Sequence, residues 1–156
     1  MNRIIECNGK GHNGFSLIEL MVVVAIIGIL AVIGNLMLQS FTEKAKVKRA
    51  ISEISSIQLK IKGFDALSDF LPHSLADIEG GNVLDPWGNP YRYTNFDTAP
   101  KGQWRKDRNL VPLNTDYDLW SMGKDGKSKP PLTAEESHDD IIRANDGAYI
   151  GRASEY

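Results

Sequence analysis

One carboxylate stands near the start of a long uncharged stretch of this chain. The acid is Glu19, in the heptapeptide GFSLIEL at residues 14–20, and the next charged residue is Glu43. Apolar residues fill most of the stretch, and burying a carboxylate in lipid costs several kcal/mol unless it has a partner. We therefore expect Glu19 to have a function. A cationic group is the partner that would remove the cost of burial.

The heptapeptide and the apolar run that follows it resemble the class III leader junction of the type IV pilin and type II secretion pseudopilin family. In that family, a prepilin peptidase cuts after the glycine and the new amino terminus is methylated. The resemblance implies that residues 1–14 are a cleaved leader peptide, that the cut follows Gly14, and that Phe15 is methylated. Glycine suits a peptidase at the membrane face, because a small residue before the bond lets the backbone enter its site.

Cleavage would give Phe15 a positively charged amine, which offers Glu19 a partner. When subunits stack in a filament, the amine of one subunit can lie near the Glu19 carboxylate of its neighbour, so that neither charge is buried unpaired. A misplaced subunit would leave both charges unpaired, and the pair would therefore fix register as well as cohesion. One alternative is a plain single-pass anchor, which leaves Gly14 and Glu19 unexplained. The other is a Glu19 that is satisfied within its own helix.

The apolar run has the length of a transmembrane or filament-core helix. Residues 15–38 comprise 24 residues, or ~36 Å at ~1.5 Å per residue, which crosses a bilayer. A secretory signal would place its apolar core before the cut and lose it, whereas this run follows the junction. The family usually has a proline past the middle of the segment. Here Gly34-Asn35, two poor helix formers, predict a weak point instead.

The helical pattern continues beyond the apolar run. Apolar residues recur at spacings of three and four over residues 47–61, which predicts an amphipathic continuation of the helix over 39–62. We therefore expect one helix over about 16–62, with Gly63 as its first strong stop signal. The second half of this helix should pack on the folded head.

A basic cluster, Lys44–Arg49, lies just outside the apolar run. We interpret it as a solvated helix face; a membrane-surface contact and a charge pair between subunits are the alternatives. The positive-inside rule would put such a cluster in the cytoplasm. The family resemblance implies the opposite: the short leader stays in the cytoplasm and the head crosses. The expectation is a single-pass protein of the bacterial inner membrane with its head in the periplasm.

Residues 63–156 are expected to form the periplasmic globular head. The sequence DPWGNPY at 85–91 suits a β-turn followed by a half-buried strand, and it resembles a segment of the major, G-type pseudopilins. A second strand is expected at 116–123, ending in a glycine turn, and Asn-Asp-Gly at 145–147 predicts a hairpin. The patterns and the resemblance together predict an α+β, pilin-like fold, with a long N-terminal α-helix packed on a small antiparallel β-sheet.

The loop after the second strand resembles a loop of the major pseudopilins, and that resemblance implies a calcium site. The tripeptide KDG at 124–126 stands where the family has ADG, and hard cations prefer carboxylate and carbonyl oxygens. The expected ligands are the carboxylates of Asp125, Asp140 and Asp139 and the carbonyls of Leu119, Ser121 or Met122. The loop departs from the family pattern at Lys124, Lys127, Lys129 and Pro130-Pro131. A solvated acidic turn is the alternative.

The mature chain offers few groups for catalysis. Its only cysteine, Cys7, lies in the leader, so no disulfide and no thiol nucleophile would remain after cleavage. We expect a substrate of enzymes rather than an enzyme. The net charge of −2 gives no reason to expect a nucleic-acid partner. We interpret the basic segment 101–108, around Trp104, as an inserted solvent loop, with DNA binding as the alternative.

These observations and the resemblance predict a structural subunit of a periplasmic pseudopilus in a type II secretion system. The expected partners are further copies in a homopolymer filament, other pseudopilins, the prepilin peptidase and the inner-membrane assembly platform. The alternatives are a type IV pilin for adhesion, motility or DNA uptake, and a minor pseudopilin that starts or caps the filament. A membrane-anchored binding protein is a third, and it predicts that changing Glu19 leaves function intact.

Overall fold

A computed structural model describes residues 14–108 and 112–156 of the chain. The chain divides into two units, Met1–Phe41 and Thr42–Tyr156, and the long helix α1 (Leu17–Ser68) contributes to both. The predicted leader, with Cys7, lies outside the described residues except for Gly14.

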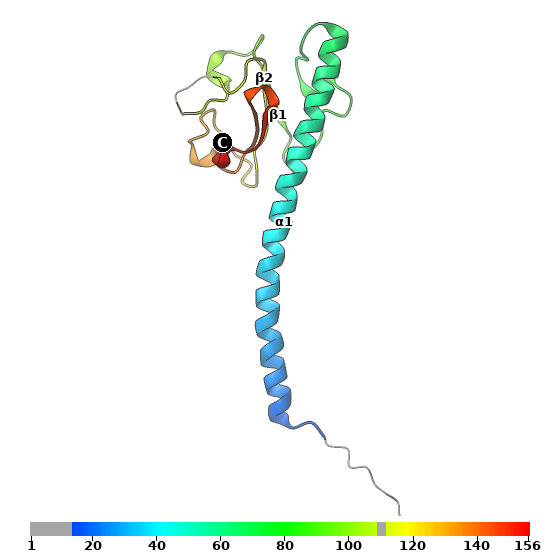
Figure 1. The fold of residues 1–156 in the computed structure, drawn as a ribbon, viewed down its shortest axis with the longest axis vertical. Coiled ribbons are helices and arrows are strands. Elements are labelled where there is room, and N and C mark those ends of the chain that lie inside the picture. Colours follow the sequence, from blue (N-terminus) through cyan, green and yellow to red (C-terminus); the bar gives the residue numbers. More distant parts are fainter. Residues whose placement is uncertain (1–13, 109–111) are drawn as a thin grey trace, which may run out of the picture. The chain divides into compact units, whose positions relative to one another are not determined.

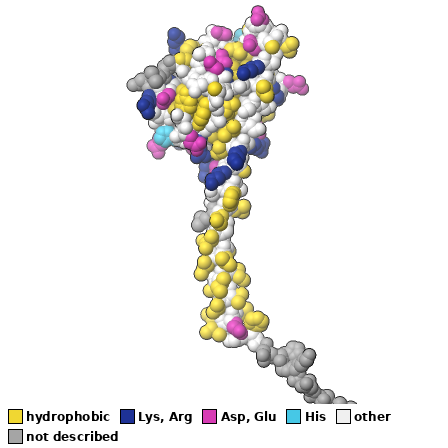
Figure 2. All heavy atoms as spheres, viewed as in Figure 1, with side chains coloured by type: hydrophobic (Ala, Val, Ile, Leu, Met, Phe, Trp, Pro, Cys, Tyr) yellow, Lys and Arg dark blue, Asp and Glu magenta, His cyan; other side chains and the backbone are white. Residues whose placement is uncertain are grey.

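In the first unit, α1 presents apolar side chains to its surroundings. Every described side chain from Leu17 to Phe41 is exposed, and Figure 2 shows hydrophobic side chains over this part of the helix. By length and composition, α1 can cross a membrane. The helix continues through Gly34-Asn35, the predicted weak point, where the Asn35 side-chain oxygen accepts a hydrogen bond from Gln39 Nε2 at 3.4 Å.

In the second unit, α1 extends beyond its predicted end. The helix passes through Gly63 and ends at Ser68 instead of residue 62. Glycine inside a helix costs only about 1 kcal/mol relative to alanine, and the packing of Phe64 on the core offsets that cost. The helix stops where Asp69 takes a left-handed backbone conformation, with φ of 61°.

The head contains a four-stranded antiparallel sheet with the strand order β1-β2-β3-β4. Its strands are β1 (Arg92–Asn95), β2 (Tyr117–Ser121), β3 (Ile141–Ala144) and β4 (Tyr149–Arg152). Register pairs Tyr93 with Leu119, Trp120 with Ile142, and Ile142 with Gly151. The long helix and this sheet confirm the predicted α+β, pilin-like fold.

Short 3-10 helices lie between these elements and after β4. They are η1 (Leu75–Asp77), η2 (Lys101–Gln103), η3 (Glu135–Ser137), η4 (Asn145–Gly147) and η5 (Ala153–Glu155). The predicted hairpin is confirmed at η4, which joins β3 to β4. All three residues of η4 have positive φ, the conformation that Asn, Asp and Gly tolerate best.

Both faces of the sheet carry buried apolar side chains. One face packs against the second-unit part of α1, which runs beside the sheet in Figure 1. This core contains Ala50, Ile54, Ile57 and Ile61 from α1, and Tyr91, Tyr117, Leu119 and Ile141 from the sheet and its approach. Loops cover the other face, where the buried residues are Leu113, Leu132, Ile142, Ala144 and Ala153. The loops are therefore part of the folded core of the head.

Candidate functional site

The predicted assembly residue Glu19 lies in the first turn of α1 and caps it. Its Oε2 accepts a hydrogen bond from the backbone N–H of Ser16 at 2.9 Å, and Ser16 Oγ accepts one from the N–H of Ile18 at 3.3 Å. This is a reciprocal cap of the Ser-x-x-Glu type, which satisfies N–H groups that have no partner within the helix. In the single chain, Glu19 is thus hydrogen-bonded within its own helix.

The surroundings of Glu19 are apolar and open. The carboxylate shares a shallow groove with Phe15, Ile18, Val22 and Val23. Phe15 itself is 85% exposed. The carboxylate lies in the first turn of α1, where the helix dipole stabilises a negative charge. A cationic group that entered the groove would therefore lie on an apolar surface next to the Glu19 carboxylate.

The acids that were predicted as calcium ligands accept hydrogen bonds from different groups of the protein. Asp140 is completely buried, and its Oδ2 accepts hydrogen bonds from Arg105 Nη2 at 2.6 Å and Ser128 Oγ at 2.6 Å. Asp125 is exposed, and its Oδ1 accepts from the N–H of Lys127 at 2.8 Å. The two best-matched acids therefore face different groups.

Asp139 binds the backbone of the loop that it was expected to join through a cation. Its Oδ2 accepts from the N–H of Lys124 at 2.7 Å and of Asp125 at 3.1 Å. Gly123 makes this approach possible: its φ is +63°, and a Cβ there would lie 2.5 Å from the Asp139 carbonyl oxygen. Asp139 thus anchors the 123–125 turn directly.

Two of the three predicted carbonyl ligands, Leu119 and Ser121, lie in β2, and the third, Met122, directly follows it. Leu119 is buried in the core against α1. The side chain of Ser121 is also buried, donating to Asp85 Oδ2 at 2.5 Å and accepting from the N–H of Gly123 at 3.1 Å. Ser121 therefore connects the end of β2 with the 85–90 turn.

The DPWGNPY segment anchors the end of β2, a role that the sequence did not reveal. Asp85 Oδ1 accepts from the N–H of Trp87 at 3.0 Å and of Asn89 at 2.8 Å. Asn89 Nδ2 then donates to the carbonyl of Gly123 at 3.0 Å. The predicted turn is present, since the N–H of Gly88 donates to the Asp85 carbonyl at 2.9 Å. The segment thus holds the same turn that Asp139 anchors.

These residues, as they lie, do not fit a calcium ion. Within residues 14–108 and 112–156, no group of three or more His, Cys, Asp or Glu side chains converges on a metal position. Calcium takes ~6–8 oxygen ligands, whereas the buried acid of the set is already occupied by a guanidinium. Whether calcium binds stays a prediction.

Arg105 is the site residue that sequence reasoning missed. The 101–108 segment was expected to be a solvent loop, and this expectation was wrong for Arg105, which is 2% exposed. Its partner Asp140 is 35 residues away in the sequence. Pairing between two irregular segments at that distance leaves no periodic signal in the sequence.

Burial sets the electrostatics around Arg105. It raises the pKa of Asp140 to about 6, against the opposing effects of Arg105 and the Ser128 hydrogen bond. It also raises the pKa of Asp118 to about 6, against the hydrogen bond from the backbone N–H of Arg105. Both carboxyls are thus removed from water, which disfavours their charged forms. Their hydrogen bonds partly offset this effect by stabilising the charged forms.

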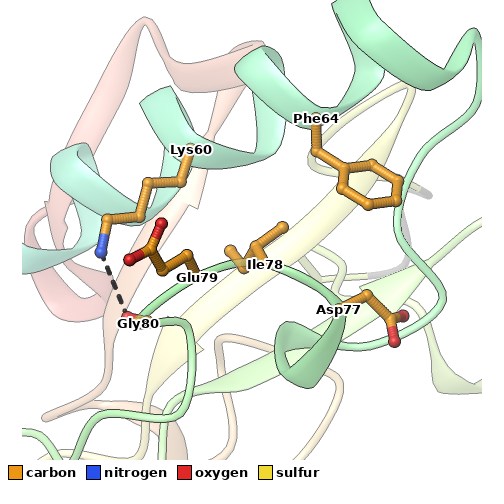
Figure 3. Close-up of a pocket in the computed structure, with 6 residues that line it drawn as sticks. All are labelled: Lys60, Phe64, Asp77, Ile78, Glu79 and Gly80. Atoms are coloured by element: carbon orange, nitrogen blue, oxygen red, sulfur yellow. Dashed lines mark hydrogen bonds between the residues drawn. The ribbon is translucent and has the colours of Figure 1, made fainter.

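A surface pocket elsewhere on the head contains none of the predicted site residues. Figure 3 shows its lining, which is Lys60, Phe64, Asp77, Ile78, Glu79 and Gly80. Lys60 reaches from α1 to the segment after η1, where its Nζ donates to the Gly80 carbonyl at 3.2 Å. The bond fastens this segment to the helix, and nothing at the pocket points to a ligand.

Comparisons with known proteins give concordant results. A sequence model of the prokaryotic N-terminal methylation motif matches residues 9–34. The type II secretion system core protein G of Aeromonas hydrophila is 32% identical over 142 residues, covering 76% of this chain and 87% of that protein. The protein of the same description from Pseudomonas aeruginosa PAO1 is 32% identical over 139 residues, also covering 76% and 87%.

A fimbrial protein of Pseudomonas aeruginosa is 53% identical, but over only 49 residues, which are 31% of this chain and 32% of that protein. No solved structure matches the chain.

The N-terminal methylation motif, the apolar helix and the four-stranded antiparallel sheet define the class as pilin-like. Within that class, the chain belongs to the family of the type II secretion system core protein G, because the identity to members of that family extends over most of both chains.

Proposed function

We propose that this chain is a structural subunit of the pseudopilus of a type II secretion system. Membership of the core protein G family supports this function. The observation that carries it is Glu19, an acid that the chain keeps at the head of an exposed apolar helix. A plain membrane anchor gains only the cap at Ser16 from such an acid, whereas a filament built from that helix can also use its charge.

Processing would precede assembly. In the proposal, the prepilin peptidase cuts after Gly14 and Phe15 is then methylated. Apart from its chain neighbours, no described residue has an atom within 4 Å of the position where a Cβ would stand at Gly14. The described part of the fold therefore does not require glycine there, and a requirement of the peptidase explains it. The high exposure of Phe15 leaves the adjoining peptide bond accessible.

Assembly would give Glu19 a second partner. Before assembly, the hydrogen bond from the Ser16 N–H lowers the cost of keeping the carboxylate near lipid. In the filament, the new amine on Phe15 of a neighbouring copy would enter the groove beside Glu19. The pair would then compensate both charges in the apolar filament core.

The proposed location follows from the same elements. The apolar part of α1 would anchor the subunit in the inner membrane, and the head would lie in the periplasm. An inner-membrane assembly platform would add subunits to a filament of identical copies together with other pseudopilins. The subunit itself would perform no catalysis.

Complementation tests this function against its rival, a type IV pilin. In cells that lack this chain, we expect the proteins exported by the system to accumulate in the periplasm, and the wild-type chain to restore their release. The assay measures one exported enzyme in the medium and in the periplasm. Normal export combined with loss of surface fibres would contradict the proposal and favour the pilin, to which the short fimbrial match points.

A further inference from the structure

The Arg105 side chain joins two long loops of the head from a buried position. Its Nη2 donates to Asp140 Oδ2 at 2.6 Å, and its Nη1 donates to Ser128 Oγ and, at 2.9 Å, to the Lys129 carbonyl. The guanidinium also lies over the Trp120 ring, 5.1 Å from its centroid. One cation thus contacts an acid, a hydroxyl, a carbonyl and an aromatic face.

The backbone around Arg105 is fixed on both sides. The N–H of Arg105 donates to Asp118 Oδ2 at 2.6 Å, and its carbonyl accepts from the N–H of Leu113 at 3.2 Å. The next residue, Lys106, pairs with the opposite loop: its N–H donates to Pro130 at 3.0 Å and its carbonyl accepts from Leu132 at 2.9 Å. The segment that carries the guanidinium is therefore held in place by backbone hydrogen bonds on both sides.

The ligands of Arg105 are of the kind that a hard cation would take. Carboxylate, hydroxyl and carbonyl oxygens from a loop are typical calcium ligands, and here they surround a guanidinium. Two buried atoms of the pair, Asp140 Oδ1 and Arg105 Nε, have no hydrogen-bond partner in the part of the chain that is described. A single remaining oxygen cannot provide the shell that calcium requires.

Three further acids of the loop are also engaged. Asp139 and Asp125 accept backbone hydrogen bonds, and Glu136 pairs with Lys129 at 2.6 Å. Within the described residues, these contacts hold the loop without a metal ion. A guanidinium suits this position because its planar donors bind several oxygens at once and it stays charged when buried.

We propose that Arg105 takes the place of a divalent cation at this loop, so that the head folds and holds residues 124–140 in place without calcium. The Arg105–Asp140 pair is a built-in cross-link supplied by the 101–108 segment. The proposal concerns the stability of the head and does not depend on filament assembly.

Thermal unfolding of the full mature chain in detergent tests the proposal. All three tryptophans, Trp87, Trp104 and Trp120, lie in the head, so their fluorescence reports its unfolding. We expect the midpoint temperature in EDTA and in 1 mM calcium to agree within about 1 °C. A site with a Kd of about 10 µM would raise it by about 10 °C or more under those conditions. Such a rise would overturn the proposal.

Variants of Arg105 and its neighbour give the matched comparison. Arg105→Gln should lower the midpoint by more than about 10 °C in EDTA, because it leaves the Asp140 carboxylate buried without a cation. Lys106→Ala removes the adjacent positive charge and should change the midpoint by less than about 3 °C, as other surface substitutions do. Equal midpoints for Arg105→Gln and the wild type would contradict the proposal.

The variant Asp125→Asn distinguishes stabilisation by the Arg105 guanidinium from stabilisation by bound calcium. The amide oxygen can still accept from Lys127, so we expect an unchanged midpoint and no response to calcium. Equilibrium dialysis of the wild type against radioactive calcium completes the test and requires no variant to fold. Stoichiometric binding that Asp125→Asn abolishes would show a metal site and overturn the proposal.

Discussion

Buried arginines hold the head together at two places, and Arg143 is the more central one. Its Nε donates to Gln58 of α1 at 2.8 Å, and its Nη1 and Nη2 donate to Asp116 at 2.7 and 2.8 Å. The guanidinium also lies 4.0 Å from the centroid of the Tyr117 ring. Arg143 thus ties the helix to the sheet through hydrogen bonds from within a largely apolar contact.

Arg143→Ala should destabilise the head by about 2–4 kcal/mol, because Asp116 and Gln58 lose their buried partner. The estimate is below the usual cost of breaking a fully buried pair, since the Asp116 side chain is 33% exposed and can be hydrated. Urea unfolding followed by tryptophan fluorescence measures the change. Arg92→Ala, at an exposed position on β1, is the control and should shift stability by less than about 0.5 kcal/mol. Equal effects of the two changes would show that burial of Arg143 contributes nothing.

At the scale of elements, the two faces of α1 in the head have different roles. Ile54 is completely buried against the sheet, whereas Leu59 is 69% exposed. Both are large aliphatic residues in the same stretch of helix, so alanine substitutions compare the faces directly. Only the inward face contributes packing within the single chain.

Ile54→Ala should cost about 2–5 kcal/mol, since it removes apolar contacts and leaves a cavity in a packed core. Leu59→Ala should change the stability of the single chain by less than about 0.5 kcal/mol. Urea unfolding of the detergent-solubilised chain distinguishes them. A large loss for Leu59→Ala would mean that the outward face is covered within one chain, contrary to the structure.

Apolar periodicity predicted the helix and the strands well. The features that it missed depend on contacts between segments that are distant in the sequence. Burial of one face of a helix or strand produces a periodic pattern of apolar residues. This pattern is visible in the sequence, both over 47–61 and in the strands. The helix end was misplaced because Gly63 was interpreted as a strong stop signal, although a glycine costs a helix only about 1 kcal/mol and Phe64 packs on the folded core. The cap at Ser16 and Glu19 could have been read from the Ser-x-x-Glu spacing.

The site was less predictable than the fold for the same reason. Asp140 was singled out from a family resemblance, but its partner comes from a segment that composition marked as solvated. Ser121 was expected to offer a carbonyl to a metal, and its hydroxyl instead binds Asp85. Each of these pairings joins residues more than thirty positions apart, where sequence pattern gives no guidance.

At the scale of the whole molecule, one chain combines an exposed apolar helix segment with a head held by its own core and ion pairs. The head needs no disulfide, since Cys7 is the only cysteine and lies in the predicted leader. The exposed apolar segment requires lipid or other copies of itself to cover it. Glu19 is the charged group in that segment, and its charge is therefore central to the proposed assembly.

The most direct test of this account combines intact mass with filament yield for three forms of the chain in cells that contain the prepilin peptidase. The forms are wild type, Glu19→Ala and Glu19→Gln; the last keeps an oxygen that can accept from Ser16 but removes the charge. We expect all three to lose residues 1–14. The wild type gains one methyl group and forms filaments visible by electron microscopy. Both variants should lose at least about tenfold in filament yield, because an unpaired buried charge costs ~3 kcal/mol or more. An uncut wild-type chain, or filaments of Glu19→Gln at the wild-type level, would contradict the account.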